Sequence, residues 1–99
     1  MLRPDDTFKL YPDGEGDGNP VLIYRAQSAG YWLDFQKRYR AGESDPDWLE
    51  TLVDLTSEGL VGWENIEGEC NRENFAAKFT MADLLRIALE LPTRALLAG

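Results

Sequence analysis

The chain has 99 residues, 43% of them hydrophobic and 28% charged, which is typical of one small globular domain over residues 1–99. Its 18 acidic residues outnumber its 10 basic ones, and the formal net charge of −8 disfavours direct binding to nucleic acid or to an anionic membrane. The sequence has no histidine and one cysteine, so a Ser-His-Asp or Cys-His catalytic site and an intramolecular disulfide are excluded.

The sequence favours a cytoplasmic location. The first six residues, Met-Leu-Arg-Pro-Asp-Asp, contain no apolar signal segment, and no stretch reaches the roughly 20 apolar residues that a membrane span requires. A secreted domain of this size usually carries several disulfides. We therefore expect a protein of the cytoplasm, with no membrane contact.

The first 25 residues predict a β-hairpin. Residues 7–11 alternate between apolar and polar side chains, and residues 21–25 are rich in β-branched and aromatic residues, both typical of strands. Between them, residues 12–20 read Pro-Asp-Gly-Glu-Gly-Asp-Gly-Asn-Pro, a run of turn-forming residues. We expect this run to be a long, mobile, acidic tip.

The acidic tip partly imitates a calcium-binding loop. Asp13, Glu15 and Asp17 alternate as in the opening of an EF-hand loop, but the twelfth position is Tyr24 instead of the bidentate Glu. Strands are also expected on both sides of the tip, where an EF-hand has helices. The sequence therefore predicts no specific calcium site, and no other metal or cofactor site.

Two helices are expected next. Ser28 is a candidate N-cap and Gly42 a candidate stop, and the aromatic residues between them fall at helical spacing on one face. Asp45 is a candidate N-cap for the second helix, with Pro46 at its first position and Gly59 closing it. Such aromatic side chains could stack on nucleobases, but a structural role in the core is favoured.

The region after Gly59 is harder to assign. Residues 59–66 suit a short strand or an ordered loop whose Trp63 contacts the core. Residues 67–78 show no period and predict a loop with at most one helical turn, around residues 73–77. The expected fold class is α+β: an N-terminal hairpin followed by three or four packed helices.

The last helix has the clearest sequence signals. Thr80 and Asp83 form a capping-box pattern, and Phe79 can pack on Leu84 as a hydrophobic staple. Pro92 either ends this helix or begins a final turn. The apolar residues occupy more of the helix circumference than one buried stripe needs, which predicts a docking surface for a partner or a second copy. The predicted contact residues are Met81, Leu84, Leu85, Ile87, Leu91, Leu96 and Leu97. The alternative is that the hairpin and the aromatic helix cover this helix on both sides.

No catalytic residue is predicted. Cys70 lies between Glu69 and Asn71, and the acidic neighbour is expected to raise the pKa of its thiol. Carboxylates are plentiful, but a chain of this length rarely encloses a cleft that could fix two of them. We therefore expect a protein without enzymatic activity.

Four segments, in order along the chain, resemble a known class of phage protein. They are residues 6–10, residues 20–25, the run Gly-Leu-Val-Gly-Trp-Glu-Asn-Ile at 59–66, and residues 79–85. Together they are similar to small phage and prophage proteins of the tail assembly chaperone type, encoded among tail genes. The resemblance implies a non-enzymatic protein that binds tail components such as the tape measure protein, and it implies no catalytic residues.

A second function fits length and charge equally well. A small acidic phage or mobile-element protein could present carboxylates to the basic groove of a host nucleic-acid-binding machine and inhibit it. A phosphate mimic needs acids spaced along one face, whereas here they fall in loops and at helix starts, with cations between them. This distribution favours the assembly function.

Overall fold

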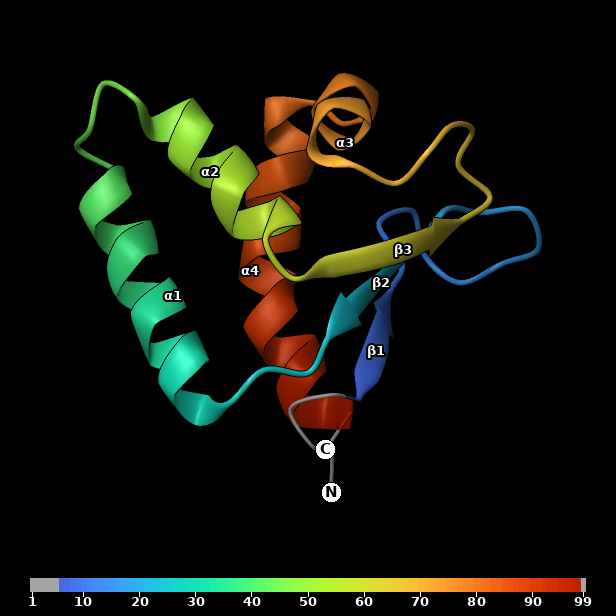
Figure 1. Cartoon of the computed structure of the whole chain (residues 1–99), viewed down its shortest axis with the longest axis horizontal. Helices are drawn as coiled ribbons and strands as arrows, with labels where there is room; N and C mark the ends of the chain where they lie inside the picture. Colours follow the sequence, from blue (N-terminus) through green and yellow to red (C-terminus); the bar gives the residue numbers. More distant parts are fainter. Residues whose placement is uncertain (1–5, 99) are drawn as a thin grey trace.

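Three strands and four helices make up residues 6–98, the part of the chain that the computed structural model describes (Figure 1). In chain order they are β1 (Thr7–Leu10), β2 (Val21–Arg25), α1 (Ala29–Gly42), α2 (Trp48–Ser57), β3 (Leu60–Glu64), α3 (Arg72–Lys78) and α4 (Met81–Ala98). The fold class is α+β, as the sequence predicted. The third strand lies between α2 and α3 in the chain, within residues 59–66, for which the sequence allowed either a strand or an ordered loop.

The sheet is antiparallel throughout, in the order β1-β2-β3. The predicted hairpin is confirmed, with Phe8 opposite Tyr24 and Leu10 opposite Leu22, and all four side chains are buried. The segment for which the sequence allowed a strand or a loop contains β3. This strand pairs with β2, with a shift of register between Ile23 and Tyr24. Trp63 on β3 is half-buried and packs against the core, as expected.

The acidic tip of the hairpin is closed by hydrogen bonds. Gly14 and Gly18 have φ angles of 85° and 80°, which glycine adopts without the steric cost of a side chain. The Asn19 side chain donates to the carbonyl of Gly14 at 3.2 Å, and the Asn65 side chain donates to the carbonyl of Asn19 at 2.9 Å. The tip is thereby tied to the loop that follows β3.

The start of α2 differs from the prediction. Asp45 does not cap the helix, because its carboxylate accepts from the backbone N–H of Asp47 at 2.9 Å and closes a turn around Pro46 instead. The helix begins three residues later, at Trp48. At the end of α1 the ring of Trp48 leaves no room for a side chain on Gly42, so a glycine is needed there for close packing.

The loop predicted at residues 67–78 is shorter than expected, because the helical turn expected around residues 73–77 is the complete helix α3, Arg72–Lys78. Asn71 caps α3 by accepting from the backbone N–H of Asn74 at 2.8 Å, and the ring of Phe75 is completely buried. Arg72 binds Asp54 on α2 at 2.8 Å. A helix of seven residues with one buried anchor has no apolar period, so the sequence pattern could not show its full length.

The final helix begins as predicted and continues further. The Thr80–Asp83 capping box is confirmed: the backbone N–H of Thr80 donates to the Asp83 carboxylate at 3.0 Å, and that of Asp83 donates to the Thr80 hydroxyl at 3.1 Å. Pro92 lies inside α4 and does not end it. Leu91 before it is buried and Ala95 after it packs on the core, so tertiary contacts hold both sides of the proline in one helix.

The core lies between the helices and one face of the sheet. Helix α4 packs against α2 and β1, and α1 packs against α2 (Figure 1). The hydroxyl of Tyr24 donates to the carbonyl of Thr56 at 2.6 Å and so joins the sheet to the end of α2. No helix among residues 6–98 is long and apolar enough to span a bilayer.

Candidate functional site: a groove between two helices

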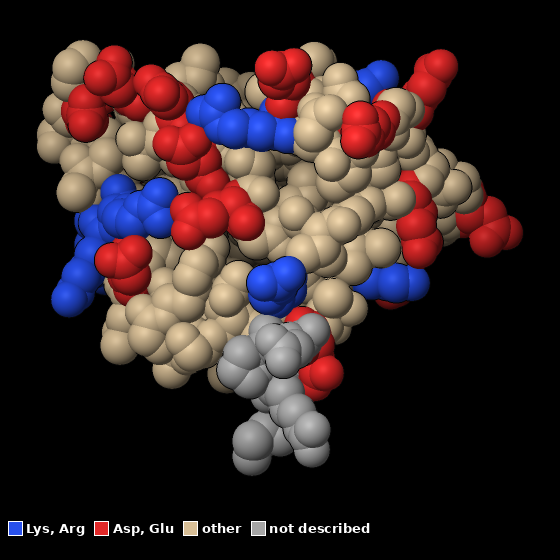
Figure 2. All heavy atoms as spheres, in the orientation of Figure 1, with Lys and Arg blue, Asp and Glu red and all other residues tan. Residues whose placement is uncertain are grey.

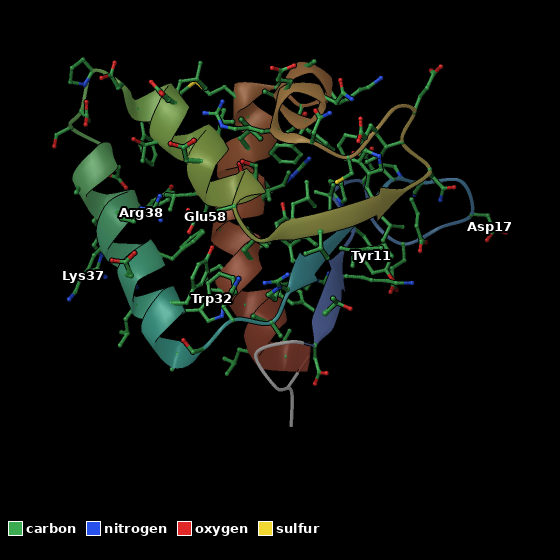
Figure 3. The ribbon with its side chains drawn as sticks, viewed as in Figure 1. Tyr11, Asp17, Trp32, Lys37, Arg38 and Glu58 are labelled. Carbon is green, nitrogen blue, oxygen red and sulfur yellow. The ribbon has the colours of Figure 1, made fainter. Side chains whose placement is uncertain are left out.

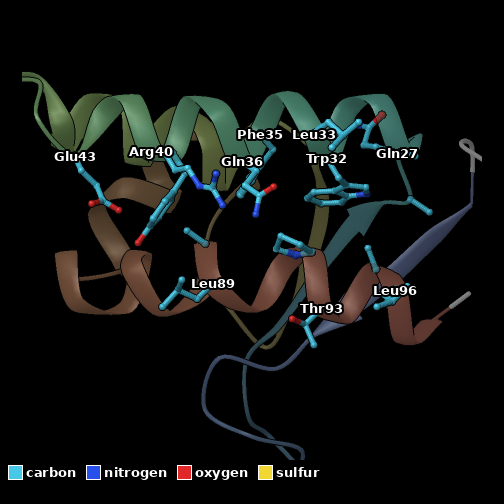
Figure 4. A pocket seen from close by; sticks show the side chains of 16 residues that line it. Gln27, Trp32, Leu33, Phe35, Gln36, Arg40, Glu43, Leu89, Thr93 and Leu96 are labelled. Atoms are coloured by element: carbon cyan, nitrogen blue, oxygen red, sulfur yellow. The ribbon is translucent and has the colours of Figure 1, made fainter.

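A groove lies between α1 and α4 (Figure 4). Its volume is about 1100 Å³. One wall is α1 with the segment before it, and the other is the middle and C-terminal part of α4. The α1–α4 groove is lined by Ala26, Gln27, Ala29, Trp32, Leu33, Phe35, Gln36, Tyr39, Arg40, Glu43, Ala88, Leu89, Pro92, Thr93, Ala95 and Leu96.

Aromatic rings form the inner wall of the groove on the α1 side. Trp32 and Phe35 pack edge to face with ring centroids 5.3 Å apart, and Tyr39 packs in the same way on Trp48 at 5.2 Å. The ring of Trp32 also lies against that of Phe8 in the sheet, with ring centroids 6.4 Å apart. These rings contact one another and the core, so the predicted structural role of the aromatic residues is confirmed. They also give the groove a rigid apolar surface.

The rim of the groove consists of exposed leucines. Leu33 on α1 is 62% exposed, and Leu89 and Leu96 on α4 are 64% and 79% exposed. Monomeric proteins rarely expose three large aliphatic side chains around one apolar hollow. Such an arrangement is typical of surfaces that bind another protein.

One charged group points into the groove. The guanidinium of Arg40 extends from α1 towards α4, and Glu43 lies at the same end (Figure 4). Arg40 makes no ion pair within residues 6–98. The groove therefore offers an apolar surface with one free cation near its end.

The structure divides the seven predicted contact residues into two groups. Leu84, Ile87 and Leu91 are buried in the core on the side of α4 that packs against α2 and β1, so in the folded chain they are not accessible to a partner. Leu85 is half-buried. The exposed members are Met81, Leu96 and Leu97.

Sequence reasoning missed the contribution of α1. Leu33 lies next to Trp32 in the sequence but outside the regular aromatic face, and it is the exposed leucine of the α1 wall. The sequence did contain a signal for this wall: Leu33 is an aliphatic residue at a position that the helical pattern places on the solvent-exposed side. Only the position of α4 opposite this residue shows that the two helices share one groove.

A second surface is acidic. Figure 2 shows carboxylates crowded over α2 and the α1–α2 connection, with basic side chains between them. Arg38 binds Glu58 at 2.9 Å, and the hydrogen bond to Glu58 raises the pKa of Arg38 (Figure 3). Arg72 binds Asp54. Several of the acids on this face are thus already paired with cations of the same chain.

The pKa values of Cys70 and Tyr31 are both raised. Cys70 is half-buried, and burial raises the pKa of its thiol, so the predicted direction holds but its cause is desolvation and not the neighbouring Glu69. Burial raises the pKa of Tyr31 to about 12. Within residues 6–98 no three acidic, cysteine or histidine side chains are grouped so as to hold a metal ion. Asp17 on the hairpin tip projects into solvent (Figure 3).

Comparison with known proteins identifies no relative: no family model matches the sequence, and neither a curated protein nor a solved structure matches the chain.

Proposed function

We propose that this chain is a non-enzymatic protein-binding module that holds an apolar helical segment of a partner in the α1–α4 groove. The observation that carries the proposal is the groove itself, with aromatic rings inside it and Leu33, Leu89 and Leu96 exposed around it. An amphipathic helix lying in a hydrophobic groove is a recurrent mode of recognition between proteins.

The dimensions of the groove set the length of that segment. The α4 wall extends from Ala88 to Leu96, about 12 Å along the helix axis at 1.5 Å per residue. This length accommodates two to three turns of a partner helix, with aliphatic anchors at positions i, i+3 or i+4, and i+7. A carboxylate at one end of the partner segment would pair with the free guanidinium of Arg40.

The biological setting that we propose is phage tail assembly in the cytoplasm of a bacterial host. The support for it is the resemblance of four sequence segments to tail assembly chaperones. A protein that guards apolar helical stretches of a tape measure protein needs an open apolar groove and no catalytic group. The partner is then a tail component, and neither nucleic acid nor a membrane is contacted directly.

The test is co-purification of the tagged chain with the products of neighbouring tail genes, with variants confined to the α1 wall. Leu33→Asp places a carboxylate on the rim, and Arg40→Glu removes the free cation. We expect each variant to reduce binding of the partner about tenfold or more, the effect of roughly 1.4 kcal/mol at an interface.

The matched control is Val61→Asp on β3. Val61 is also an exposed aliphatic residue, but it lies outside the groove, so its substitution should leave binding unchanged. Circular dichroism establishes that all three variants are folded. Equal binding by Leu33→Asp, Arg40→Glu and the wild type would rule out the groove as the binding site.

The alternative function, inhibition of a host nucleic-acid-binding protein, draws its support from the acidic face in Figure 2. Glu43, Asp45, Asp47 and Glu50 are exposed acids around the start of α2. In this case a variant with Glu43→Lys and Asp47→Lys would lose inhibition of nucleic-acid binding, while Leu33→Asp would not. The ion pairs of Arg38 and Arg72 reduce the charge of this face, which favours the groove.

A further inference from the structure

The side of α4 that faces away from the core carries a second apolar strip. It consists of Leu89, Thr93, Leu96 and Leu97, and we call it the α4 ridge. Leu97 is 72% exposed, and Thr93 is exposed as well. The flank of the ridge carries Glu90 and Arg94, which lie on the side opposite the groove.

The sequence of the ridge is self-complementary about its centre. Leu89 lies four residues before Thr93, and Leu96 and Leu97 lie three and four residues after it. When two such helices pack antiparallel with a twofold axis near Thr93, Leu89 of each copy meets Leu96 and Leu97 of the other. Every exposed leucine of the ridge then contacts a leucine.

The charges on the flank have their midpoint at Pro92, within one residue of the midpoint of the leucines, so one twofold axis serves both. In an antiparallel pair related by a twofold axis, the same flank of each helix meets its own copy, so Glu90 of one chain lies opposite Arg94 of the other, twice. Neither side chain has an ion pair within residues 6–98, although the two are four residues apart on one helix. Both charges are therefore free for partners across the interface.

The charge of the surface also favours a second copy over an unrelated partner. The chain as a whole carries a formal charge of −8, which opposes self-association, whereas Glu90 and Arg94 cancel each other on the ridge. Two copies that approach through this surface avoid the acidic face over α2. An unrelated partner would not require opposite charges on the two sides of the apolar centre.

We propose that the α4 ridge is the interface of a homodimer in which two α4 helices pack antiparallel, with the twofold axis near Thr93 and two Glu90–Arg94 ion pairs between the chains. The ridge shares Leu89, Thr93 and Leu96 with the α1–α4 groove, so this dimer and a partner helix in the groove would compete for the same side chains. Arg94 does not line that groove, so a variant at Arg94 tests the dimer alone.

The test is sedimentation equilibrium of the full chain and of charge variants. Arg94→Glu and Glu90→Arg each place like charges opposite one another at both ion-pair positions, and each should be monomeric at concentrations where the wild type is dimeric. The double variant Glu90→Arg/Arg94→Glu restores both pairs and should dimerise again. An equimolar mixture of the two single variants should form a heterodimer, because the charges of one then match those of the other.

The control is Arg25→Glu, an exposed position on β2 that changes the net charge by the same amount as Arg94→Glu. It should dimerise like the wild type. A wild-type chain that stays monomeric, with a dissociation constant weaker than about 1 mM, would overturn the proposal. A dimer that Arg94→Glu does not weaken, or single variants that fail to associate when mixed, would overturn the antiparallel arrangement.

Discussion

The two sides of α4 are both apolar, yet they are packed very differently. On the side that faces α2 and β1, Leu84, Ile87 and Leu91 are at most 2% exposed. On the side that faces α1 and solvent, Leu89 and Leu96 remain mostly exposed. The exposed leucines of the second side therefore add little to the core, which is why we propose that they bind a partner.

The difference follows from the side chains that face α4 from each neighbouring element. Helix α2 presents aliphatic residues such as Leu52 and Leu55, which are completely buried against it. Helix α1 presents large rings that pack on one another and on the sheet, with Tyr31 and Trp32 only 5.0 Å apart. Rings held in this way do not close over α4, and a groove stays open between the two helices.

The largest effect that separates the two sides is expected from a pair of matched substitutions on α4. Leu91→Ala removes a buried side chain and should lower the free energy of unfolding by about 2–5 kcal/mol. Leu89→Ala removes the same atoms from an exposed position and should change it by no more than about 0.5 kcal/mol. Urea denaturation at low protein concentration measures both. Equal losses would show that the two sides contribute alike to folding.

A smaller effect is expected at the polar link on the closed side. Tyr24→Phe removes the hydroxyl that donates to the carbonyl of Thr56, and leaves that buried acceptor without its partner. We expect a loss of about 1–3 kcal/mol in the free energy of unfolding. Tyr39→Phe, on the groove side, is the control and should cost less. Similar losses in both variants would contradict the assignment of Tyr24 as a link between the sheet and α2.

The smallest effect concerns the start of α4, which both sides share. The hydrogen bond from the backbone N–H of Thr80 lowers the pKa of the Asp83 carboxyl. A lowered pKa in the folded state means that the stabilisation is complete above the unfolded value of about 4 and is lost as the pH falls through the folded value. Asp83→Asn should therefore cost about 0.3–1 kcal/mol at pH 7.

The pH dependence distinguishes this charge effect from a loss of packing. The difference in stability between the wild type and Asp83→Asn should shrink in denaturation curves recorded below about pH 4, where the wild-type carboxylate is also neutralised. Glu67→Gln, at an exposed loop position, is the control and should show no comparable difference. A gap between the wild type and Asp83→Asn that stays constant down to pH 2 would contradict the role of the charge.

Local signals in the sequence determined much of this protein. Alternation over residues 7–10 and the β-branched run at 21–25 specified the hairpin, and Thr80 with Asp83 specified the start of α4, because these patterns act between neighbouring residues. The excess of apolar residues on α4 was also visible, and it predicted a binding helix. The sequence did not show which of those residues are exposed in the folded chain.

Tertiary contacts decided the remaining features. Residues 60–64 form a strand because β2 offers them an edge, and α3 exists because Phe75 is buried between its neighbours. The helix continues through Pro92 because Leu91 and Ala95 both pack on the core. Helical periodicity places Leu84 and Leu89 alike on a wide apolar surface. The neighbours that cover Leu84 and leave Leu89 exposed are distant in the sequence, so only the folded chain separates core residues from exposed ones.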